Sequence, residues 1–568
     1  MRAVDATLAS LKRAGVTAIF GLPGGPVIPL FDALHDDPDI RTFLVRHEQG
    51  AGHMAEGYAK VTGRAGVCTA TSGPGATNLV TPIADAYMDS VPLVAITGQV
   101  GASRVGTDAF QEADIVGITM PIVKHSYLIK DADELPLAMA EALHVAQTGR
   151  PGPVLVDVCV DQWGRDVEDY TETVPPMAGY RPPEGAGHPR QIEAAARALA
   201  AAERPVVYAG GGIISGEASA ELTHLSEVTG IPVNTTLMGL GGFPGTHPLF
   251  IGMPGMHGLA AATYAFQAAD LILAVGVRFD ERVLSTVMNE WAPNAKIIHI
   301  DVDPAEISKN RSAHIGIAGQ AAPALAALAH AYTALAEPHD AAARAAWVDQ
   351  IAAWKRQHPY RVDEGPEGVI QPQRVVQAIY RITRGDAIVC TDVGQHQMWA
   401  AQHYPFDRPR RWITSGGLGT MGFGLPAALG AQVAHPDELV VVISGDGSFE
   451  MTLQELSTAQ MYGLPVKVVI LNNGYLGMVR QWQELFWGGR YAGSSFEPFQ
   501  PSFAGIAAAY GIHAATVHDP SDLDSAIAEA FAADGPALVD VHVSPLAKVF
   551  PMVPSGKGPG DIMVGPAG

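Results

Sequence analysis

Two short apolar runs rich in β-branched residues, at 440–443 and 466–471, constrain the fold of this chain more than any other stretch. Between them the apolar residues follow a helical period, with Leu453, Leu456 and Ala459 on one side. The order is therefore strand, helix, strand. Neither run alternates with polar residues, so we expect both strands to be buried on both faces, as in a parallel sheet covered by helices. An α/β fold class follows.

Small polar residues follow each of these runs. Ligands of open α/β sheets bind at the edge where the strands end, and Mg²⁺ prefers carboxylate, amide and phosphate oxygens. We expect a helix that begins near Phe449 to direct its positive N-terminal dipole at the same place. The pattern predicts a magnesium diphosphate site, whereas GDG alone is a common turn. The residues are Gly445, Asp446, Gly447 and Ser448 after the first run, and Asn472 and Asn473 after the second.

The combination of GDG, an intervening helix, a second strand and NN resembles the cofactor motif of the thiamine diphosphate enzymes. By this resemblance the ligands of Mg²⁺ are Asp446, Asn473 and the backbone carbonyl of Tyr475. Gly447 and Ser448 are implied as cofactor contacts.

Bulk properties limit the class of protein. A chain of 568 residues is too long for one hydrophobic core and suggests roughly three domains. The net charge of −22 disfavours nucleic acid as a partner. The three cysteines, Cys68, Cys159 and Cys390, are far apart, which favours buried free thiols and a reducing cytoplasm. No apolar run is long enough for a membrane helix, and the N-terminus reads as an amphipathic helix rather than a signal peptide, with a removed transit peptide left open.

Alternating helical and strand-like segments predict three doubly wound domains with mainly parallel sheets. The expected ranges are 1–165, 188–335 and 366–545, with a Pro- and Gly-rich linker around 168–190 and a mobile C-terminal tail at 546–568. The resemblance implies that these domains hold the pyrimidine ring, FAD, and the diphosphate with Mg²⁺, in that order.

Glu48 follows a strand and precedes a glycine-rich helix start, so we expect it to be partly buried. A buried carboxylate is costly without a partner or a task, and a plain helix N-terminal role is the alternative. By resemblance, Glu48 hydrogen-bonds the aminopyrimidine ring of thiamine diphosphate and drives its imino tautomer. His47, Gln49 and His53 are expected to be packing and hydrogen-bonding neighbours.

Two further strings, TSGPGATN at 71–78 and GTDAFQE at 106–112, resemble acetohydroxyacid synthase, also called acetolactate synthase. The resemblance places Phe110 and Gln111 at the active site. On the alternative interpretation both strings are loop and core positions. The family also implies Gln395 and His396 at the diphosphate end of the cofactor, and Gly419 and Met421 beside its aminopyrimidine ring.

The middle region has four strand-to-loop transitions, which is the outline of a nucleotide-binding domain. Its triple glycine lacks the GxGxxG spacing and is weak support for a dinucleotide, and Asp301 suits either a ribose hydroxyl or a helix N-cap. The resemblance implies FAD in a structural, non-redox role. Its contacts would be Arg150, Gly211, Thr236, Leu237, Met238, His257, Gly276, Arg278 and Asp301.

Arg282 and Trp482 are the positions that distinguish this family from other thiamine enzymes. Arg282 could bind a carboxylate through two hydrogen bonds, and Trp482 could form an apolar wall for an alkyl chain. By resemblance they select the second 2-oxo acid, and the tail closes over the site. Without this resemblance, we would expect Arg282 to be a surface ion-pair residue and Trp482 to be an aromatic residue of the core.

The resemblance implies decarboxylation of pyruvate and transfer of the two-carbon fragment to pyruvate or 2-oxobutanoate, giving acetolactate or acetohydroxybutanoate for branched-chain amino acids. It also implies a homodimer or homotetramer and a possible regulatory subunit. A sister thiamine diphosphate enzyme, such as pyruvate oxidase, and a non-catalytic paralogue are the alternatives. The chain departs from the family pattern at Gly101, Val160 and Gln320, and in GLPGG.

Overall fold

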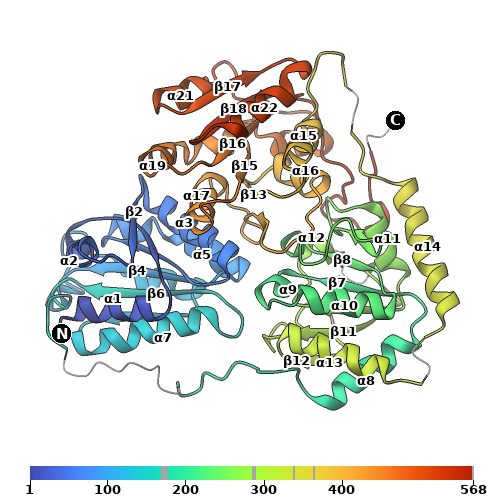
Figure 1. The fold of residues 1–568 in the computed structure, drawn as a ribbon, viewed down its shortest axis with the longest axis horizontal. Coiled ribbons are helices and arrows are strands. Elements are labelled where there is room, and N and C mark those ends of the chain that lie inside the picture. The colour runs from blue at the N-terminus through green and yellow to red at the C-terminus, as the bar shows by residue number, and fades with distance from the viewer. Residues whose placement is uncertain (168–176, 285–289, 337–338, 363–364, 566–568) are drawn as a thin grey trace. The chain divides into compact units, whose positions relative to one another are not determined.

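The computed structural model describes residues 1–167, 177–284, 290–336, 339–362 and 365–565. Three six-stranded sheets run through it (Figure 1), which confirms the α/β prediction and the three-domain fold class. The chain divides into two compact units. Unit 1 comprises 1–181, 387–396 and 413–543, and unit 2 comprises 182–386, 397–412 and 544–568. The domain boundaries expected from the sequence and the mobility of the tail stay predictions, and residues 168–176 of the expected linker lie outside the described residues.

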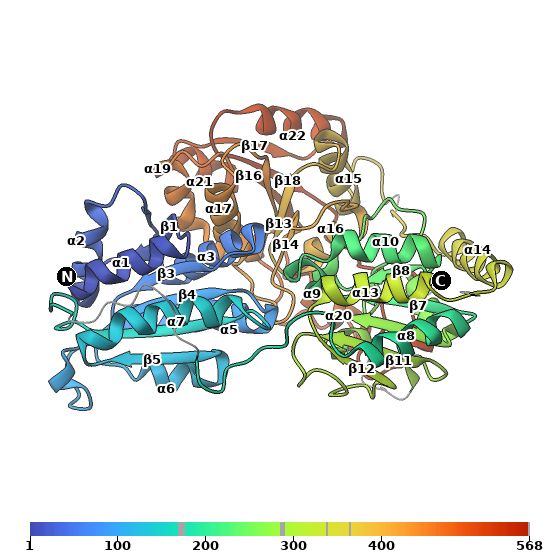
Figure 2. The ribbon, with the colours of Figure 1, turned by 60° about the horizontal axis from the view of Figure 1, so that its bottom comes forward.

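The first sheet of unit 1 has the strand order β2-β1-β3-β4-β6-β5. Figure 2 shows helix α7 lying along it. The strands are β1 Ala18–Leu22, β2 Arg41–Leu44, β3 Gly66–Ala70, β4 Leu93–Gln99, β5 His125–Ile129 and β6 Pro153–Cys159. The helices are α1 Ala3–Arg13, α2 Ile28–His35, α3 Glu48–Thr62, α4 Pro74–Thr77, α5 Val80–Asp89, α6 Ile115–Thr119 and α7 Leu135–Gln147.

The second sheet of unit 1 repeats that order, as β14-β13-β15-β16-β18-β17. Its strands are β13 Ile388–Thr391, β14 Trp412–Ile413, β15 Val440–Gly445, β16 Lys467–Asn472, β17 His513–Val517 and β18 Ala537–His542. The associated helices are α17 Gly424–Ala434, α18 Asp446–Glu450, α19 Leu456–Met461, α20 Gly477–Phe486, α21 Phe503–Ala509 and α22 Leu523–Ala532. The order reverses between β13 and β15, and ligands of such sheets bind at the strand ends beside that point.

The predicted strands β15 and β16 are buried along their whole length, as expected. The helix between them differs from the prediction in two ways. It begins at Asp446 rather than near Phe449, and it is divided into α18, a 3-10 turn at Leu453–Glu455 and α19. Thr452 interrupts it, because its Oγ1 donates a hydrogen bond to the backbone oxygen of Gly422 at 3.0 Å, and a local period cannot reveal that long-range contact.

The two sheets of unit 1 share a hydrophobic core through helices α3 and α17. Phe43, Met54 and Ile83 belong to the same buried cluster as Phe423 and Leu429. The helices are so close that a Cβ added to Gly57 would lie 1.9 Å from the backbone oxygen of Ala427. One added to Gly430 would lie 1.8 Å from that of Met54. These pairs fix an antiparallel alignment.

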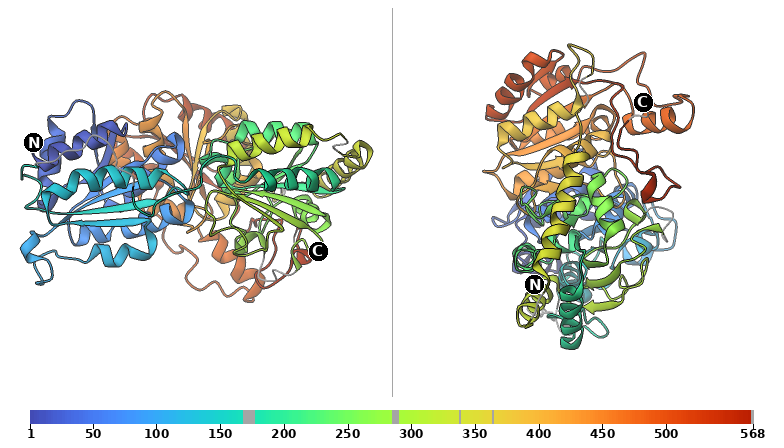
Figure 3. Two further views of the ribbon diagram at one scale, coloured as in Figure 1. Left: turned by 90° about the horizontal axis from the view of Figure 1, so that it is seen from below. Right: turned by 90° about the vertical axis from the view of Figure 1, so that its right-hand side faces the viewer.

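Unit 2 contains a sheet of different order, β12-β11-β10-β7-β8-β9, shown in green in Figure 3 with helices lying against it. Read from β9 to β12, with the strands numbered in chain order, this is 3-2-1-4-5-6, the order of dinucleotide-binding domains. The strands are β7 Pro205–Ala209, β8 Val233–Thr235, β9 Phe250–Gly252, β10 Leu271–Val275, β11 Lys296–Asp301 and β12 Ile315–Ala318. The helices are α8 Pro189–Ala201, α9 Gly211–Ser215, α10 Ser219–Thr229, α11 Ala260–Ala268, α12 Glu281–Leu284, α13 Ala321–Thr333, α14 Ala341–Gln357, α15 Pro372–Thr383 and α16 Gln395–His403, whose first two residues belong to unit 1.

All three cysteines are buried free thiols, as predicted. Among the described residues, none of the helices combines the length and apolar character needed to cross a bilayer.

Candidate functional site

Asp446, Asn473 and Tyr475 lie together at the ends of β15 and β16, as their strand positions predicted. The carboxylate of Asp446 accepts hydrogen bonds from the backbone N–H of Gly474 and from Gln500 Nε2, both at 2.8 Å. Asn473 Oδ1 accepts from the backbone N–H of Tyr475 at 3.0 Å. The structure therefore concentrates carboxylate, amide and carbonyl oxygens at one edge of the sheet.

The electrostatics of Asp446 suit a bound cation. Its side chain is 2% exposed, and burial raises its pKa to about 7, against the opposing hydrogen bond from Gln500. A buried carboxylate is stabilised when a positive charge lies beside it. An all-oxygen donor set of this kind fits Mg²⁺, which takes carboxylate and phosphate oxygens in an octahedron.

Gln395 and His396 face the same edge from the end of β13. Gln395 donates to Gln481 Oε1 at 2.8 Å and accepts from Asn473 Nδ2 at 3.3 Å. His396 is buried, its Nε2 has no hydrogen-bond partner among the described residues, and burial lowers its pKa to about 3. A buried imidazole nitrogen without a partner is the kind of group to which a phosphate oxygen or hydroxyl would hydrogen-bond.

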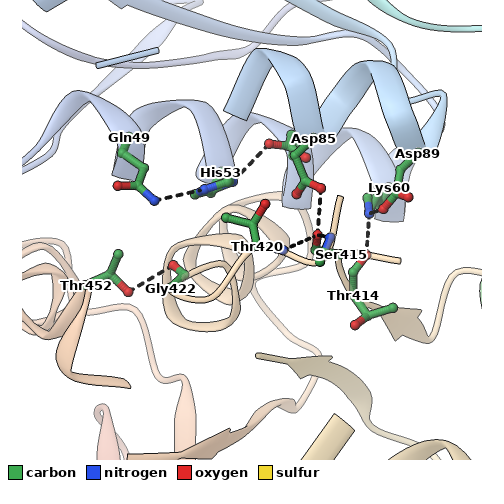
Figure 4. Close-up of polar contacts among 12 residues, drawn as sticks. Gln49, His53, Lys60, Asp85, Asp89, Thr414, Ser415, Thr420, Gly422 and Thr452 are labelled. Atoms are coloured by element: carbon green, nitrogen blue, oxygen red, sulfur yellow. Dashed lines mark hydrogen bonds and ion pairs between the residues drawn. The ribbon is translucent and has the colours of Figure 1, made fainter. Parts of the chain in front are cut away.

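The segment 415–422, of which Figure 4 labels Ser415, Thr420 and Gly422, carries Gly419 and Met421. Gly419 has a φ of +75°, which favours glycine. The hydroxyl of Ser415 accepts hydrogen bonds from the backbone N–H groups of Gly419 and Thr420, at 3.0 and 2.8 Å. Gly422 N–H donates to Asp392 Oδ1 at 2.7 Å. Met421 is partly buried at the end of this turn.

Glu48 is the first residue of α3 and is 7% exposed. Its Oε2 accepts a hydrogen bond from Asn78 Nδ2 at 3.0 Å, and a Cβ on Gly75 would lie 3.2 Å from its Oε1. Gln111, whose φ is +60°, packs against the turn at Gly73 that leads into this region. Glu48 and Gln111 thus lie near the same TSGPG turn.

One chain does not bring Glu48 and the diphosphate-type site together. Because α3 and α17 are antiparallel, the N-terminus of α17 lies beside the C-terminal end of α3, at the level of Lys60. Gly424, the first residue of α17, contacts Asp392, which ends β13. Glu48 is at the opposite end of α3, about 18 Å away along the helix axis for twelve residues at 1.5 Å each.

Five of the residues predicted to contact FAD gather where the sheet of unit 2 reverses its order, between β7 and β10. A Cβ on Gly212 would lie 2.6 Å from the Cα of Gly276, and Gly276 has a φ of +59°. Met238 packs against Gly211, at the turn that Thr236 and Leu237 begin. Such a glycine-lined crevice permits close approach of a ligand.

Four other predicted FAD residues lie elsewhere. Asp301 ends β11 and accepts from the backbone N–H of Asp303 at 2.8 Å, in a turn and not at the start of a helix, so it is not a helix N-cap. Arg278 follows β10 and is partly buried. His257 is buried, with a pKa lowered to about 4 by burial and its Nδ1 3.4 Å from the oxygen of Pro551. Arg150 belongs to unit 1, where it donates to Ser90 Oγ at 2.8 Å.

Arg282 and Trp482 lie on short helices in different units. Arg282 is exposed on α12, contacts the sulfur of Met256 at 3.2 Å, and lines a pocket with Val553 and Pro559 of the tail. Trp482 is partly buried on α20, and its indole Nε1 has no hydrogen-bond partner among the described residues. Residues 285–289, which follow α12, lie outside the described residues.

Several residues at this site escaped sequence reasoning. Gln500, Gln481 and Ser415 hydrogen-bond the predicted residues. Ser415 and Gln481 lie within strings that resemble the family but were given no role, whereas Gln500 lies outside them. The neighbouring tryptophan could have drawn attention to Gln481. Nothing in the pattern around Gln500 signals its contact with Asp446.

Comparison with known proteins identifies related sequences for the whole chain. Residues 1–118, 192–328 and 392–541 match the N-terminal TPP binding domain, the central domain and the C-terminal TPP binding domain of the thiamine pyrophosphate enzymes. The acetolactate synthase large subunit of Corynebacterium glutamicum is 49% identical, over 99% of this chain and 90% of the relative. The acetolactate synthase isozyme 3 large subunit of Escherichia coli is 46% identical, over 97% and 96%. The large subunit of Haemophilus influenzae is likewise 46% identical, over 96% and 94%.

Proposed function

The chain belongs to the acetolactate synthase large subunits, a family of thiamine pyrophosphate-dependent enzymes, and we propose in detail how its residues serve that reaction. The reaction is decarboxylation of pyruvate and transfer of the two-carbon fragment to a second 2-oxo acid. Acetolactate forms with pyruvate as acceptor and acetohydroxybutanoate with 2-oxobutanoate. The observation that carries the proposal is the near-complete match to these relatives, in a chain that keeps Glu48 and Asp446.

Thiamine diphosphate, once bound, supplies a carbon nucleophile and an electron sink for the decarboxylation. The residues of this chain hold and activate it. Asp446, Asn473 and the carbonyl of Tyr475 would bind Mg²⁺, which would neutralise charge on the diphosphate. Gln395, His396, Gly447 and Ser448 would contact the diphosphate itself.

Glu48 would act at the other end of the cofactor, on the aminopyrimidine ring. Its burial at the start of α3 suits an exchange of a proton with a ring nitrogen. Asn78 orients the carboxyl through its 3.0 Å hydrogen bond. Gly419 and Met421 would contact the same ring from the other domain, and Gln111 would lie on the substrate side.

The active enzyme would be at least a homodimer. A cofactor that contacts both Glu48 and Asp446 would be held by two chains. What supports this is that Glu48 begins α3, whereas Gly424, which contacts Asp392 at the end of β13, lies at the level of the other end of α3. A two-fold symmetric pair would form two identical sites. A homotetramer would arise from two such dimers, and a separate small subunit is proposed because the relatives are named large subunits.

Arg282 would bind the carboxylate of the acceptor 2-oxo acid, and Trp482 would contact its alkyl group. An exposed guanidinium beside a pocket can bind a carboxylate by donating two hydrogen bonds to it. The glycine-lined crevice between β7 and β10 would hold FAD in a structural role. Buried free thiols suit a reducing compartment, which supports a cytoplasmic location.

The test is to incubate the purified chain with pyruvate, thiamine diphosphate and Mg²⁺, with and without FAD. Acetolactate, acetaldehyde and hydrogen peroxide are measured together. Acetolactate as the main product supports the proposal. Acetaldehyde or peroxide as the main product would instead indicate a decarboxylase or an oxidase.

A further inference from the structure

A cluster of buried polar side chains lies against the 415–422 segment, on helices α3 and α5 of the first domain (Figure 4). Its members on these helices are His53, Glu56, Lys60, Asp85 and Asp89, of which all but Lys60 and Asp89 are among the most deeply buried polar residues. None of them has a part in the proposed chemistry. Burying charged groups costs free energy unless they have partners. Asp85 and Asp89 find theirs in the 415–417 backbone and in Ser415.

Asp85 acts on the segment through one hydroxyl group. Ser415 Oγ donates to Asp85 Oδ1 at 2.6 Å while it accepts from the backbone N–H groups of Gly419 and Thr420. The hydroxyl therefore closes the turn that carries Gly419. Its single proton is directed at Asp85, which leaves its lone pairs for the two N–H groups.

Asp89 holds the middle of the same segment directly. Its Oδ2 accepts from the backbone N–H of Gly416 at 3.0 Å, and its Oδ1 accepts from that of Gly417 at 2.7 Å. Lys60 Nζ donates to Asp89 Oδ2 at 2.7 Å and to the backbone oxygen of Thr414. Four consecutive residues, from Thr414 to Gly417, are thus fixed by α3 and α5.

We propose that Asp85 and Asp89 are positioning residues, which hold the 415–422 segment in the shape that lets Gly419 and Met421 contact the pyrimidine ring of thiamine diphosphate. The inference rests on the proposed function, because that function assigns Gly419 and Met421 to the cofactor. Asp85 acts through Ser415 and touches neither cofactor nor substrate. The interdomain contact thereby has a second role besides packing: the first domain shapes the cofactor contact of the third.

The environment of Asp85 identifies its conservative replacement. Burial, and then the nearby Glu56 carboxyl, hold the pKa of Asp85 well above its usual range. Asparagine has nearly the same shape as the aspartic acid side chain and keeps an oxygen that accepts hydrogen bonds. The amide oxygen of Asp85→Asn can still accept from Ser415, whereas Asp85→Ala removes the acceptor.

The experiment measures the Kd of thiamine diphosphate at saturating Mg²⁺, by titration calorimetry on the full-length enzyme stripped of cofactor. The variants are Ser415→Ala, Asp85→Ala, Asp85→Asn and the double variant Ser415→Ala/Asp85→Ala. We expect Ser415→Ala and Asp85→Ala each to raise Kd about tenfold, as for loss of a buried hydrogen bond. Asp85→Asn should stay within about twofold of the parent, and the double variant should match Ser415→Ala, because coupled residues are not additive.

Thr97→Val is the matched control. It removes a buried hydroxyl that donates to a buried carboxyl at nearly the same distance, 2.7 Å to Asp157 Oδ1, in the same domain but away from the segment. It should lower the unfolding temperature without changing Kd. If Asp85→Ala does not fold, Ser415→Ala and Asp85→Asn decide the question.

An unchanged Kd in Ser415→Ala would overturn the inference, as would losses that multiply in the double variant or an equal loss in Thr97→Val. Failure of the proposed function has a different signature. The parent enzyme would then bind thiamine diphosphate without forming acetolactate, and the Kd series would still report on the segment.

Discussion

At the scale of single residues, the proposed function depends on two carboxyl side chains with different roles, those of Asp446 and Glu48. Asp446 is buried and accepts hydrogen bonds from Gly474 and Gln500, and a cation beside it would stabilise its charged form. Glu48 is buried at the start of α3 with Asn78 on one carboxyl oxygen. In the proposed function, the first would hold a diphosphate through Mg²⁺, and the second would exchange a proton with the aminopyrimidine ring.

Glu48→Gln should lower kcat by about 100- to 10,000-fold, because the amide cannot take part in proton exchange. The Kd of thiamine diphosphate should change by only a few-fold, since the amide keeps the shape and the Asn78 contact. Steady-state kinetics and calorimetry check both numbers. Glu141→Gln, which removes a carboxylate bonded to Tyr127 in the same domain, is the control. Full turnover in Glu48→Gln would contradict the assigned role.

Asn473→Ala should raise the Mg²⁺ concentration needed for half-maximal cofactor binding by about 10- to 100-fold, a range seen when groups around a metal are removed. Magnesium titrations at fixed thiamine diphosphate measure it. Asn234→Ala, which removes a buried amide from unit 2, should leave the Mg²⁺ requirement unchanged. A requirement that is the same in Asn473→Ala and the parent would remove Asn473 from the metal site.

Some of these contacts could be predicted from the sequence, and others could not. The proximity of Asp446 and Asn473 was predictable, because neighbouring parallel strands end at one edge of a sheet. The contacts of Gln500 with Asp446 and of Asp85 with Ser415 join positions 54 and 330 residues apart. No local pattern encodes such contacts.

At the scale of elements, α3 and α17 hold the two domains of unit 1 together through glycines. Gly430→Ala should lower the unfolding temperature, because its new methyl group would overlap the backbone oxygen of Met54, 1.8 Å away. Overpacking of this kind typically costs about 1–3 kcal/mol. Differential scanning calorimetry measures the shift. Gly164→Ala, where an added Cβ meets nothing within 4 Å, should have little effect. Equal unfolding temperatures for the two variants would show that α3 and α17 can move apart without a cost in stability.

The elements themselves were predictable where one period governs the chain. Strands β15 and β16 were identified correctly because their β-branched runs are uninterrupted and fully buried. The helix between them was predicted as one piece, and it is broken because Thr452 bonds to Gly422 in another segment.

At the scale of the whole molecule, several imidazoles are buried in neutral form. Burial lowers the pKa of His53, His257 and His403 to about 4 in each case. An unfolded imidazole binds a proton near pH 6.5, whereas these folded ones do not until about pH 4. Their contribution to stability is therefore present above pH 6.5 and is lost as the pH falls toward 4.

In His53→Gln, the stability should decrease less as the pH falls, because one buried imidazole has been removed. A pKa lowered from 6.5 to about 4 corresponds to about 3 kcal/mol for one imidazole, as an upper figure. Unfolding temperatures of the parent and of His53→Gln, measured from pH 7 to pH 4.5, should converge as the pH falls. The exposed His35→Gln serves as the control. A constant difference at every pH would exclude His53 as a source of the pH dependence.

The central claim is that one active site needs Glu48 from one chain and Asp446 from another. Mixing the inactive variants Glu48→Gln and Asp446→Ala by co-expression tests it most directly. Random pairing makes half of the dimers mixed, each with one intact site, so about a quarter of the parent's acetolactate-forming activity should return. A mixture as inactive as either variant alone, in dimers shown to contain both chains, would contradict the account.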